Sequence, residues 1–325
     1  MEKKKNCSIR ELAASVGLST CTVSKVLNGR NDFKIREETR RRVFEAAARL
    51  NYVPNINAQR LFLHKSHVIG LLVPSRTEGD SAFADHHFVD ILAGMEQSLS
   101  DSNYSLLLLF SDPEAEKNLR YLNLFRSGAF DGLLIWGARR SDRAFLKLEE
   151  YDAPHLFITS IPGTGHPNYV THNYTHSTEI LTRKLIDSGC RDLLFLAGPE
   201  GNSVAEEMLH GVVAATEGRA RFRLRRCAYQ REEARRETVE ACREHRPDGV
   251  IAASSGQARG ACDVLPEAPR VMLDSSRVTF EPVDCLGAAR TDDCKLGRHA
   301  IEGLIQLIES PENRIEQTLP LQLML

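Results

Sequence analysis

Residues 8–29 read SIRELAASVGLSTCTVSKVLNG, and this stretch decides the fold of the N-terminal part of the chain. Ser8 and Glu11 form the S-x-x-E pattern of a capping box, which predicts a helix over SIRELAAS. Gly17 interrupts that helix, and Ser19 can cap a second helix that ends at the asparagine-glycine pair. Two short helices around a tight turn with glycine are typical of a helix-turn-helix.

A third helix is predicted over residues 36–51. Its apolar residues recur at helical spacing, so they form one face of the helix, with arginines opposite: Val43, Ala46, Ala47 and Leu50. This face can cover the first two helices. The sequence therefore predicts an all-α head of three helices.

Charge is distributed unevenly along the 325 residues, although the net charge is only −2. Residues 1–65 hold 14 Lys and Arg against 6 Asp and Glu, whereas the remaining residues hold 28 against 38. A compact basic module joined to an acidic body indicates that the small end meets a polyanion. The alternative is that the basic end is simply a solvated surface.

From residue 67 onward, short apolar runs alternate with amphipathic segments of helical length. The predicted strands cover residues 68–74, 104–110, 131–137, 155–160, 169–173, 192–198, 222–229, 248–254 and 270–275. Near-continuous apolar strands that alternate with helices predict parallel sheets covered on both faces. Nine βα units exceed one doubly wound sheet, so the predicted fold is the helix-turn-helix head followed by an α/β core of two doubly wound lobes.

Several classes of protein are disfavoured. The eight cysteines include no CxxC pair, which indicates reduced thiols in the cytoplasm, and the apolar run at 104–110 is too short to cross a membrane. The histidine pairs His86-His87 and His172/His176 lack an HExxH context, and no nucleotide-binding or nucleophile motif occurs. We therefore expect no metal, no cofactor and no enzymatic activity.

The segments ELAASVGLSTCTVSKVLNG, REETRRRVFEAAARLNYVPNINAQRL and VIGLLVPS strongly resemble the LacI/GalR (lactose-repressor) family of bacterial transcription regulators. The likeness continues at FDGLLIWG, SGCRDLLFLAGP and CKLGRHAIEGLIQLIE, and so covers essentially the whole chain. It implies a cytoplasmic, nucleoid-associated homodimer on a near-palindromic operator of double-stranded DNA, with a core that resembles periplasmic binding proteins.

The resemblance also implies three parts. Residues 1–53 would be the DNA-binding domain, 54–66 the hinge helix, and 67–325 the effector-binding and dimerisation core. Within the core, the N-lobe is expected over about 67–162 and 291–310, and the C-lobe over about 165–290 and 315–325.

The recognition helix needs short or polar side chains where it enters the major groove. Thr20, Cys21 and Lys25 hold the positions that resemble the family's base-reading sites. Ser19, Thr22 and Ser24 are expected at phosphates, and Asn28 at a phosphate or as a helix cap. Val23, Val26 and Leu27 are expected in the core of the head.

The segment after Pro54 resembles the family's hinge helix. The resemblance implies that Leu61 wedges into the minor groove at the dyad, beside Ala58, whereas Asn55 and Gln59 contact the backbone or groove edges. The alternative is that Leu61 packs within an ordinary linker helix.

The effector pocket departs from the family pattern. Thr159-Ser160 stands where Asp-Arg is common, His172-Asn173 where Asp-Asn is common, and Met208 where an effector-binding arginine is usual. The residues still expected near the cleft are Phe88, Trp136, Ser160, Asn173, Ser255 and Asp274. Either the effector differs from the usual sugar or sugar derivative, or there is none. The alternative function for the whole chain is a small-molecule sensor with a vestigial DNA-binding head.

Overall fold

The structure is a computed structural model that describes residues 7–27, 35–53, 65–73, 82–111, 114, 117–138, 145–161, 167–274 and 284–325, without the side chains of residues 84 and 274. The chain divides into two compact units, residues 1–66 and 67–325. The helical head and the α/β core of the predicted fold class are both present.

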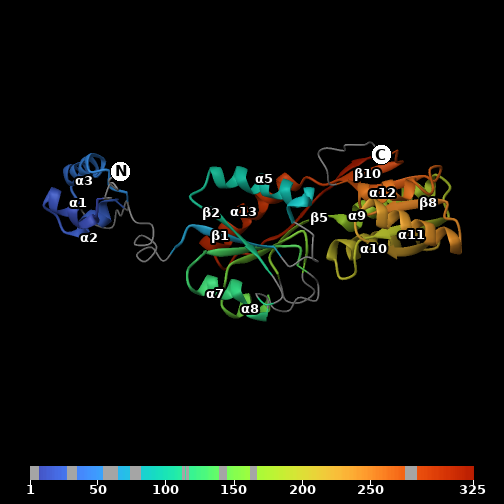
Figure 1. Cartoon of the computed structure of the whole chain (residues 1–325), viewed down its shortest axis with the longest axis horizontal. Helices are drawn as coiled ribbons and strands as arrows, with labels where there is room; N and C mark the ends of the chain where they lie inside the picture. The colour runs from blue at the N-terminus through green and yellow to red at the C-terminus, as the bar shows by residue number, and fades with distance from the viewer. Residues whose placement is uncertain are drawn as a thin grey trace, which may run out of the picture. The chain divides into compact units, whose positions relative to one another are not determined.

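The head contains α1 (Ile9–Val16), α2 (Thr20–Leu27) and α3 (Glu37–Arg49) (Figure 1). The capping box forms as predicted, because the Glu11 amide donates to Ser8 Oγ at 3.3 Å and the Ser8 amide to Glu11 Oε2 at 2.7 Å. Gly17 has a φ of 65° and ends α1 in the left-handed conformation that glycine adopts without strain. The guanidinium of Arg42 donates to the carbonyl of Val16 at 2.9 Å and so ties α3 to the end of α1.

The first lobe of the core is a six-stranded parallel sheet in the order β11-β5-β4-β3-β1-β2. Its strands are β1 (Val68–Val73), β2 (Ser105–Phe110), β3 (Gly132–Trp136), β4 (His155–Ile158), β5 (Tyr169–His172) and β11 (Glu316–Leu319). The helices α5 (His86–Ser100) and α13 (Asp293–Glu309) pack on one face, and α7 (Arg120–Arg126) and α8 (Leu146–Glu150) on the other (Figure 1). A short helix, η1 (Ala82–Ala84), precedes α5.

The second lobe repeats this plan with the order β12-β10-β9-β8-β6-β7, in which only β12 runs antiparallel to its neighbour. Its strands are β6 (Asp192–Ala197), β7 (Arg221–Arg226), β8 (Gly249–Ala252), β9 (Arg270–Asp274), β10 (Gly287–Arg290) and β12 (Gln322–Met324). One face packs against α9 (Tyr174–Asp187) and α10 (Ser203–Thr216), and the other against α11 (Arg231–Glu244) and α12 (Ser255–Cys262).

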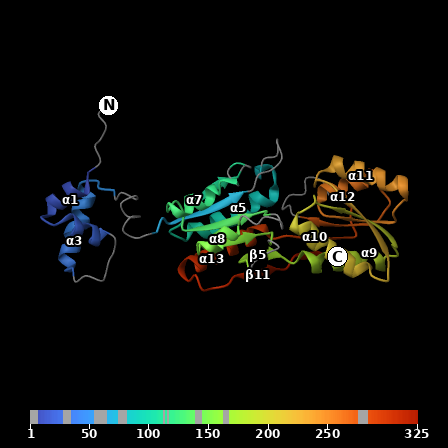
Figure 2. The same cartoon turned by 90° about the horizontal axis from the view of Figure 1, so that it is seen from below.

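Three segments connect the lobes, and two of them differ from the expected boundaries, whereas the boundary expected at about 290 agrees with the end of β10. β5 and β11 both pair in the first sheet, so the expected C-lobe ranges that begin at about 165 and 315 each contain one strand of the N-lobe. Figure 2 shows α13 and β11, near the C-terminus of the chain, in the same lobe as β5. The chain therefore crosses between β5 and α9, between β10 and α13, and between β11 and β12.

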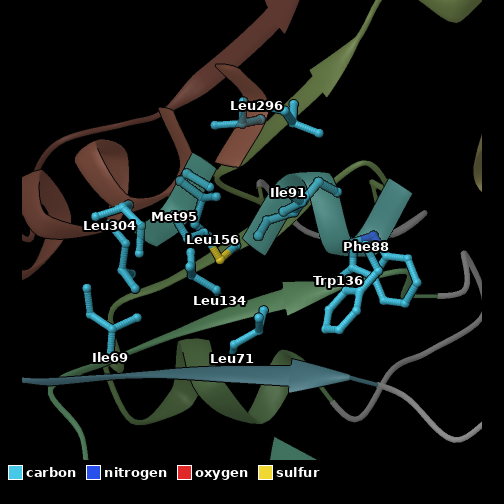
Figure 3. Close-up of a cluster of buried hydrophobic side chains, with 14 of the residues drawn as sticks. Ile69, Leu71, Phe88, Ile91, Met95, Leu134, Trp136, Leu156, Leu296 and Leu304 are labelled. Carbon is cyan, nitrogen blue, oxygen red and sulfur yellow. The ribbon is translucent and has the colours of Figure 1, made fainter. Parts of the chain in front are cut away.

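A close helix pair anchors the first lobe (Figure 3). Gly94 of α5 and Gly297 of α13 each lie against the backbone of the opposite helix: a Cβ atom at Gly94 would come within 1.9 Å of the Cys294 carbonyl oxygen. Only glycine permits this approach. The two helices then bury Ile91, Met95, Leu296 and Leu304 against the sheet.

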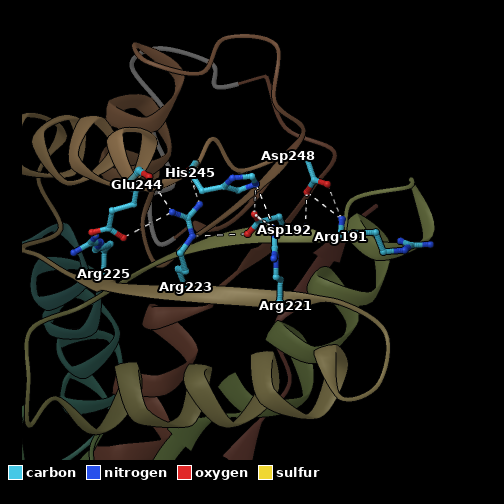
Figure 4. Close-up of polar contacts among 9 residues, drawn as sticks. Arg191, Asp192, Arg221, Arg223, Arg225, Glu244, His245 and Asp248 are labelled. Carbon is cyan, nitrogen blue, oxygen red and sulfur yellow. Dashed lines mark hydrogen bonds and ion pairs between the residues drawn. The ribbon is translucent and has the colours of Figure 1, made fainter.

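The two lobes have contrasting edge strands. β7 carries the sequence RFRLRR, and its arginines are paired. Arg221 pairs with Asp192 and Arg225 with Glu244 (Figure 4). Arg226 pairs with Glu206. Charged edge strands resist pairing with other chains. β2, at the edge of the first sheet, reads SLLLLF and has no charge, and its four leucines are only partly buried.

Candidate DNA-binding face and interlobe site

The second helix of the head has one buried face and one exposed face. Val23 and Val26 are fully buried, and Leu27 packs against the same core with Leu12 and Val43. Thr20 and Cys21 are exposed, whereas Thr22, Ser24 and Lys25 are partly exposed. The predicted base-reading residues therefore lie on the side of α2 away from the hydrophobic core.

The first turn of this helix is held by a side-chain cap. The Oγ atom of Ser19 accepts a hydrogen bond from the Thr22 amide at 3.1 Å and lies 2.9 Å from the Thr22 hydroxyl. The start of α2 is thus fixed in place while Thr20 and Cys21 remain exposed. The other residues expected at DNA lie outside the described residues: Asn28, Asn55, Ala58, Gln59 and Leu61.

In the N-lobe, the predicted effector residues lie at the carboxyl edge of the sheet. Phe88, on α5, packs its ring against Trp136, the last residue of β3, with ring centroids 4.7 Å apart (Figure 3). Both rings are almost completely buried. Ser160 follows β4 and is 3% exposed, and its Oγ atom has no hydrogen-bond partner in the part of the chain that the structure describes.

In the C-lobe, one of the predicted residues has a role within the fold. Asn173 caps α9, since its Oδ1 atom accepts from the His176 amide at 3.1 Å. Ser255 begins α12 and is partly exposed, whereas its neighbour Ser254 caps this helix and donates to the Tyr229 carbonyl at 2.9 Å. Asp274 ends β9, and its side chain lies outside the described part of the chain.

An ion pair between a buried carboxylate and a partly exposed histidine lies where the chain returns to the first lobe, and the sequence did not predict it. The Nδ1 atom of His87, on α5, lies 2.8 Å from Oδ2 of Asp293, the first residue of α13. Thr291 donates to the same oxygen at 2.9 Å. Burial alone would lower the pKa of His87, but the charge and hydrogen bond of Asp293 outweigh it and raise that pKa.

A completely buried histidine lies at another crossing. His172, the last residue of β5, is completely buried, and neither ring nitrogen makes a hydrogen bond of good geometry within the described residues. Burial lowers its pKa to about 4, with the nearby positive charge of His87 acting in the same direction. Its ring packs edge-on against Tyr174 at 5.8 Å. The only sequence signal for this cluster was the replacement of the family's Asp-Asn by His172-Asn173.

Two other positions expected near the pocket carry uncharged side chains. Met208 is buried in the hydrophobic core of the second lobe. Thr159 has a φ of 65°, an uncommon conformation for a threonine, and accepts a hydrogen bond from the Thr171 hydroxyl at 3.1 Å through its carbonyl. Among the described residues, no group of three or more His, Cys, Asp or Glu side chains could hold a metal ion.

Within the same residues, no helix is long and apolar enough to span a bilayer.

Two family models match the chain. Residues 8–55 match "Bacterial regulatory proteins, lacI family", and residues 66–286 match "Periplasmic binding proteins and sugar binding domain of LacI family". The ribose operon repressor of Bacillus subtilis is 29% identical over 208 residues, which cover 63% of this chain and 59% of that protein. The HTH-type transcriptional regulator MalR of Streptococcus pneumoniae is 25% identical over 316 residues, or 94% of each chain.

Solved structures share the fold over nearly the full length. The lac repressor dimer bound to operator and the anti-inducer ONPF superposes with a TM-score of 0.80 at 23% identity, covering 99% of this chain and 98% of that one. The transcriptional regulator CelR in complex with cellobiose gives 0.70 at 22% identity, covering 98% and 99%.

These matches confirm the predicted family and fold class, and LacI-family members are transcription regulators, not enzymes. The chain belongs to the LacI family of bacterial regulatory proteins.

Proposed function

We propose that this chain is a sequence-specific transcriptional repressor that binds a near-palindromic operator as a homodimer, under the control of a small molecule bound between the lobes. The observation that carries the proposal is the two-faced helix α2. Its buried valines hold it on the head, and Thr20, Cys21 and Lys25 present short polar or basic groups to a major groove.

Selection of bound duplexes from a random pool tests this proposal. The full chain should enrich a near-palindrome, and the affinity should fall as salt rises because each phosphate contact releases counterions. Thr20→Ala should relax the preference at one position of each half-site, whereas Thr39→Ala, the same change on α3, should not. Enrichment of no palindrome at any salt concentration would instead favour the sensor with a vestigial head.

The hinge is the second part of the proposal. Leu61 would insert at the dyad and bend the duplex, with Ala58 beside it and with Asn55 and Gln59 at the groove edges. Leu61→Ala should reduce both operator affinity and bending, as measured by the electrophoretic mobility of circularly permuted duplexes. Equal bending by this variant and the unmodified chain would indicate that Leu61 only packs in a linker.

The apolar edge strand β2 supports the homodimer. Four partly buried leucines on an uncharged sheet edge favour coverage by another molecule, and the lac repressor is a dimer in its operator complex. Leu108→Lys should shift the chain toward monomer in sedimentation velocity, whereas the volume-conserving Leu108→Met should not. A monomeric unmodified chain would contradict this part of the proposal.

The effector would be a sugar or sugar derivative held at the carboxyl edges of the two sheets. Phe88, Trp136, Ser160, Asn173, Ser255 and Asp274 are the residues proposed to be near it. CelR is described in complex with cellobiose, but the buried Met208 offers no guanidinium here. A screen for compounds that raise the melting temperature would identify the effector, since a ligand of the native state stabilises it by mass action.

A further inference from the structure

We propose that His172 makes the opening of the two lobes sensitive to pH, so that protons act as an effector of the core in their own right. The proposal rests on the position and surroundings of this side chain. It goes beyond the proposed repressor function, because it concerns the core alone and requires neither DNA nor a sugar.

His172 lies among the segments that connect the lobes. It ends β5, directly before the crossing into α9, and its strand neighbour in register is Leu319, which precedes the crossing into β12. The amide of Asn173 donates to the Leu319 carbonyl at 2.9 Å, so these two crossings are joined. A change in the angle between the lobes must therefore alter the packing around His172.

The groups that face His172 come from three elements. Asp292 and Asp293 lie at the start of α13, His87 lies on α5, and Tyr174 begins α9. The pair with Asp293 keeps the pKa of His87 above its ordinary value, and the negative charges of Asp85 and Asp90 raise this pKa further. Because His172 is completely buried, a second positive charge on it would arise next to the cation of His87 with little water to screen the two.

Because of this environment, His172 binds a proton less tightly in the closed form of the core than in the open form. In the described conformation, burial lowers the pKa of His172 to about 4, whereas a hydrated imidazole in an opened hinge has its ordinary pKa of 6.5. Protons bind the opened form better, so acid favours opening. By linkage, the ratio of open to closed molecules should rise about tenfold between about pH 7.5 and about pH 5.5.

Small-angle X-ray scattering of the full chain at these two pH values tests the proposal, with circular dichroism to verify that the chain stays folded. The radius of gyration should increase at the lower pH. His172→Gln, which keeps a polar side chain but cannot titrate, should abolish the increase. The matched control is His176→Gln: His176 is exposed on α9, and its replacement should leave the response intact.

Two results would overturn the proposal. One is an unchanged radius of gyration in the folded unmodified chain, which needs no variant; the other is the same increase in His172→Gln. If His172→Gln fails to fold, His87→Gln serves instead. Removal of the neighbouring cation should raise the pKa of His172 in the closed form toward its ordinary value and so weaken the opening at low pH, and an opening of equal or greater extent would also contradict the proposal.

Discussion

The contact between α5 and α13 makes a sharp prediction about two glycine-to-alanine changes. A Cβ atom at Gly94 would lie 1.9 Å from the carbonyl oxygen and 2.6 Å from the carbonyl carbon of Cys294. Both atoms belong to the backbone of α13, so no side chain can rotate away, and the helices must separate by more than about 1 Å to restore an ordinary carbon–oxygen contact of about 3.3 Å.

The size of the effect follows from what that separation removes. A radial gap of 0.5–1 Å forfeits roughly a quarter to a half of each dispersion contact, and the helix pair buries large side chains such as Ile91, Met95 and Leu304. We expect a loss of about 3 kcal/mol in the free energy of unfolding, at the upper end of the usual range for overpacking. The higher helix propensity of alanine offsets up to about 1 kcal/mol, which leaves a net loss of about 2 kcal/mol.

Gly303→Ala is the matched control because it lies on the same helix, α13. A Cβ atom there would meet only side-chain atoms, Leu156 Cδ1 at 3.0 Å and Ile315 Cγ2 at 3.2 Å, and these can shift by a few tenths of an ångström. The propensity gain should then dominate, so this variant should match or exceed the unmodified chain in stability.

Guanidinium unfolding followed by tryptophan fluorescence measures both variants. The chain has a single tryptophan, Trp136, which is buried in the N-lobe beside Phe88 and so reports on the lobe that contains the helix pair. A Gly94→Ala variant within about 0.5 kcal/mol of the unmodified chain would refute the argument that backbone contact sets the helix spacing.

Three further predictions concern other parts of the chain. Ser8→Ala removes the cap of α1 and should cost the head about 1 kcal/mol, measured by thermal melting of the helical signal; no loss would mean that the capping box is dispensable. Asp248→Asn should destabilise the C-lobe by about 1–3 kcal/mol in urea unfolding, because its carboxylate accepts hydrogen bonds from the Arg191 and Asp192 amides, and an unchanged midpoint would contradict this (Figure 4). Since the pKa of His172 is about 4 in the folded chain and near 6.5 when unfolded, the unfolded state binds more protons between these values, so stability should fall as pH drops from 6.5 toward 4; His172→Gln should flatten that slope in melts across this range.

Much of the secondary structure could be predicted because its signals are local. Three features of the head each depend on residues within a few positions of one another: the capping box at Ser8, the left-handed Gly17 and the apolar spacing of α3. The structure confirms all three at the predicted positions. Most of the parallel strands could also be predicted, since a strand buried on both faces is apolar along its length, but the short parallel strands β10 and β11 were missed.

The assignment of strands to lobes was less predictable. β5 and β11 are separated by well over a hundred residues, yet they pair in one sheet. The sequence of neither strand indicates which of the two sheets it joins. Two of the three lobe boundaries were placed too early for this reason. The close contacts of Gly94 and Gly297 between the two helices could not be predicted either, because the residue pattern within each helix does not indicate which helix packs against it.

By itself, the sequence determined the three-helix head, the division of α2 into a packed and an exposed face, and the alternation of strands and helices in the core. Only the tertiary structure decided that the buried His172 and Asp293 and the partly exposed His87 form one cluster where the chain passes between the lobes. The physical reason is that the spacing of apolar residues along a segment shows only which of its faces is buried. The pKa of a buried side chain depends instead on charges that distant segments bring beside it.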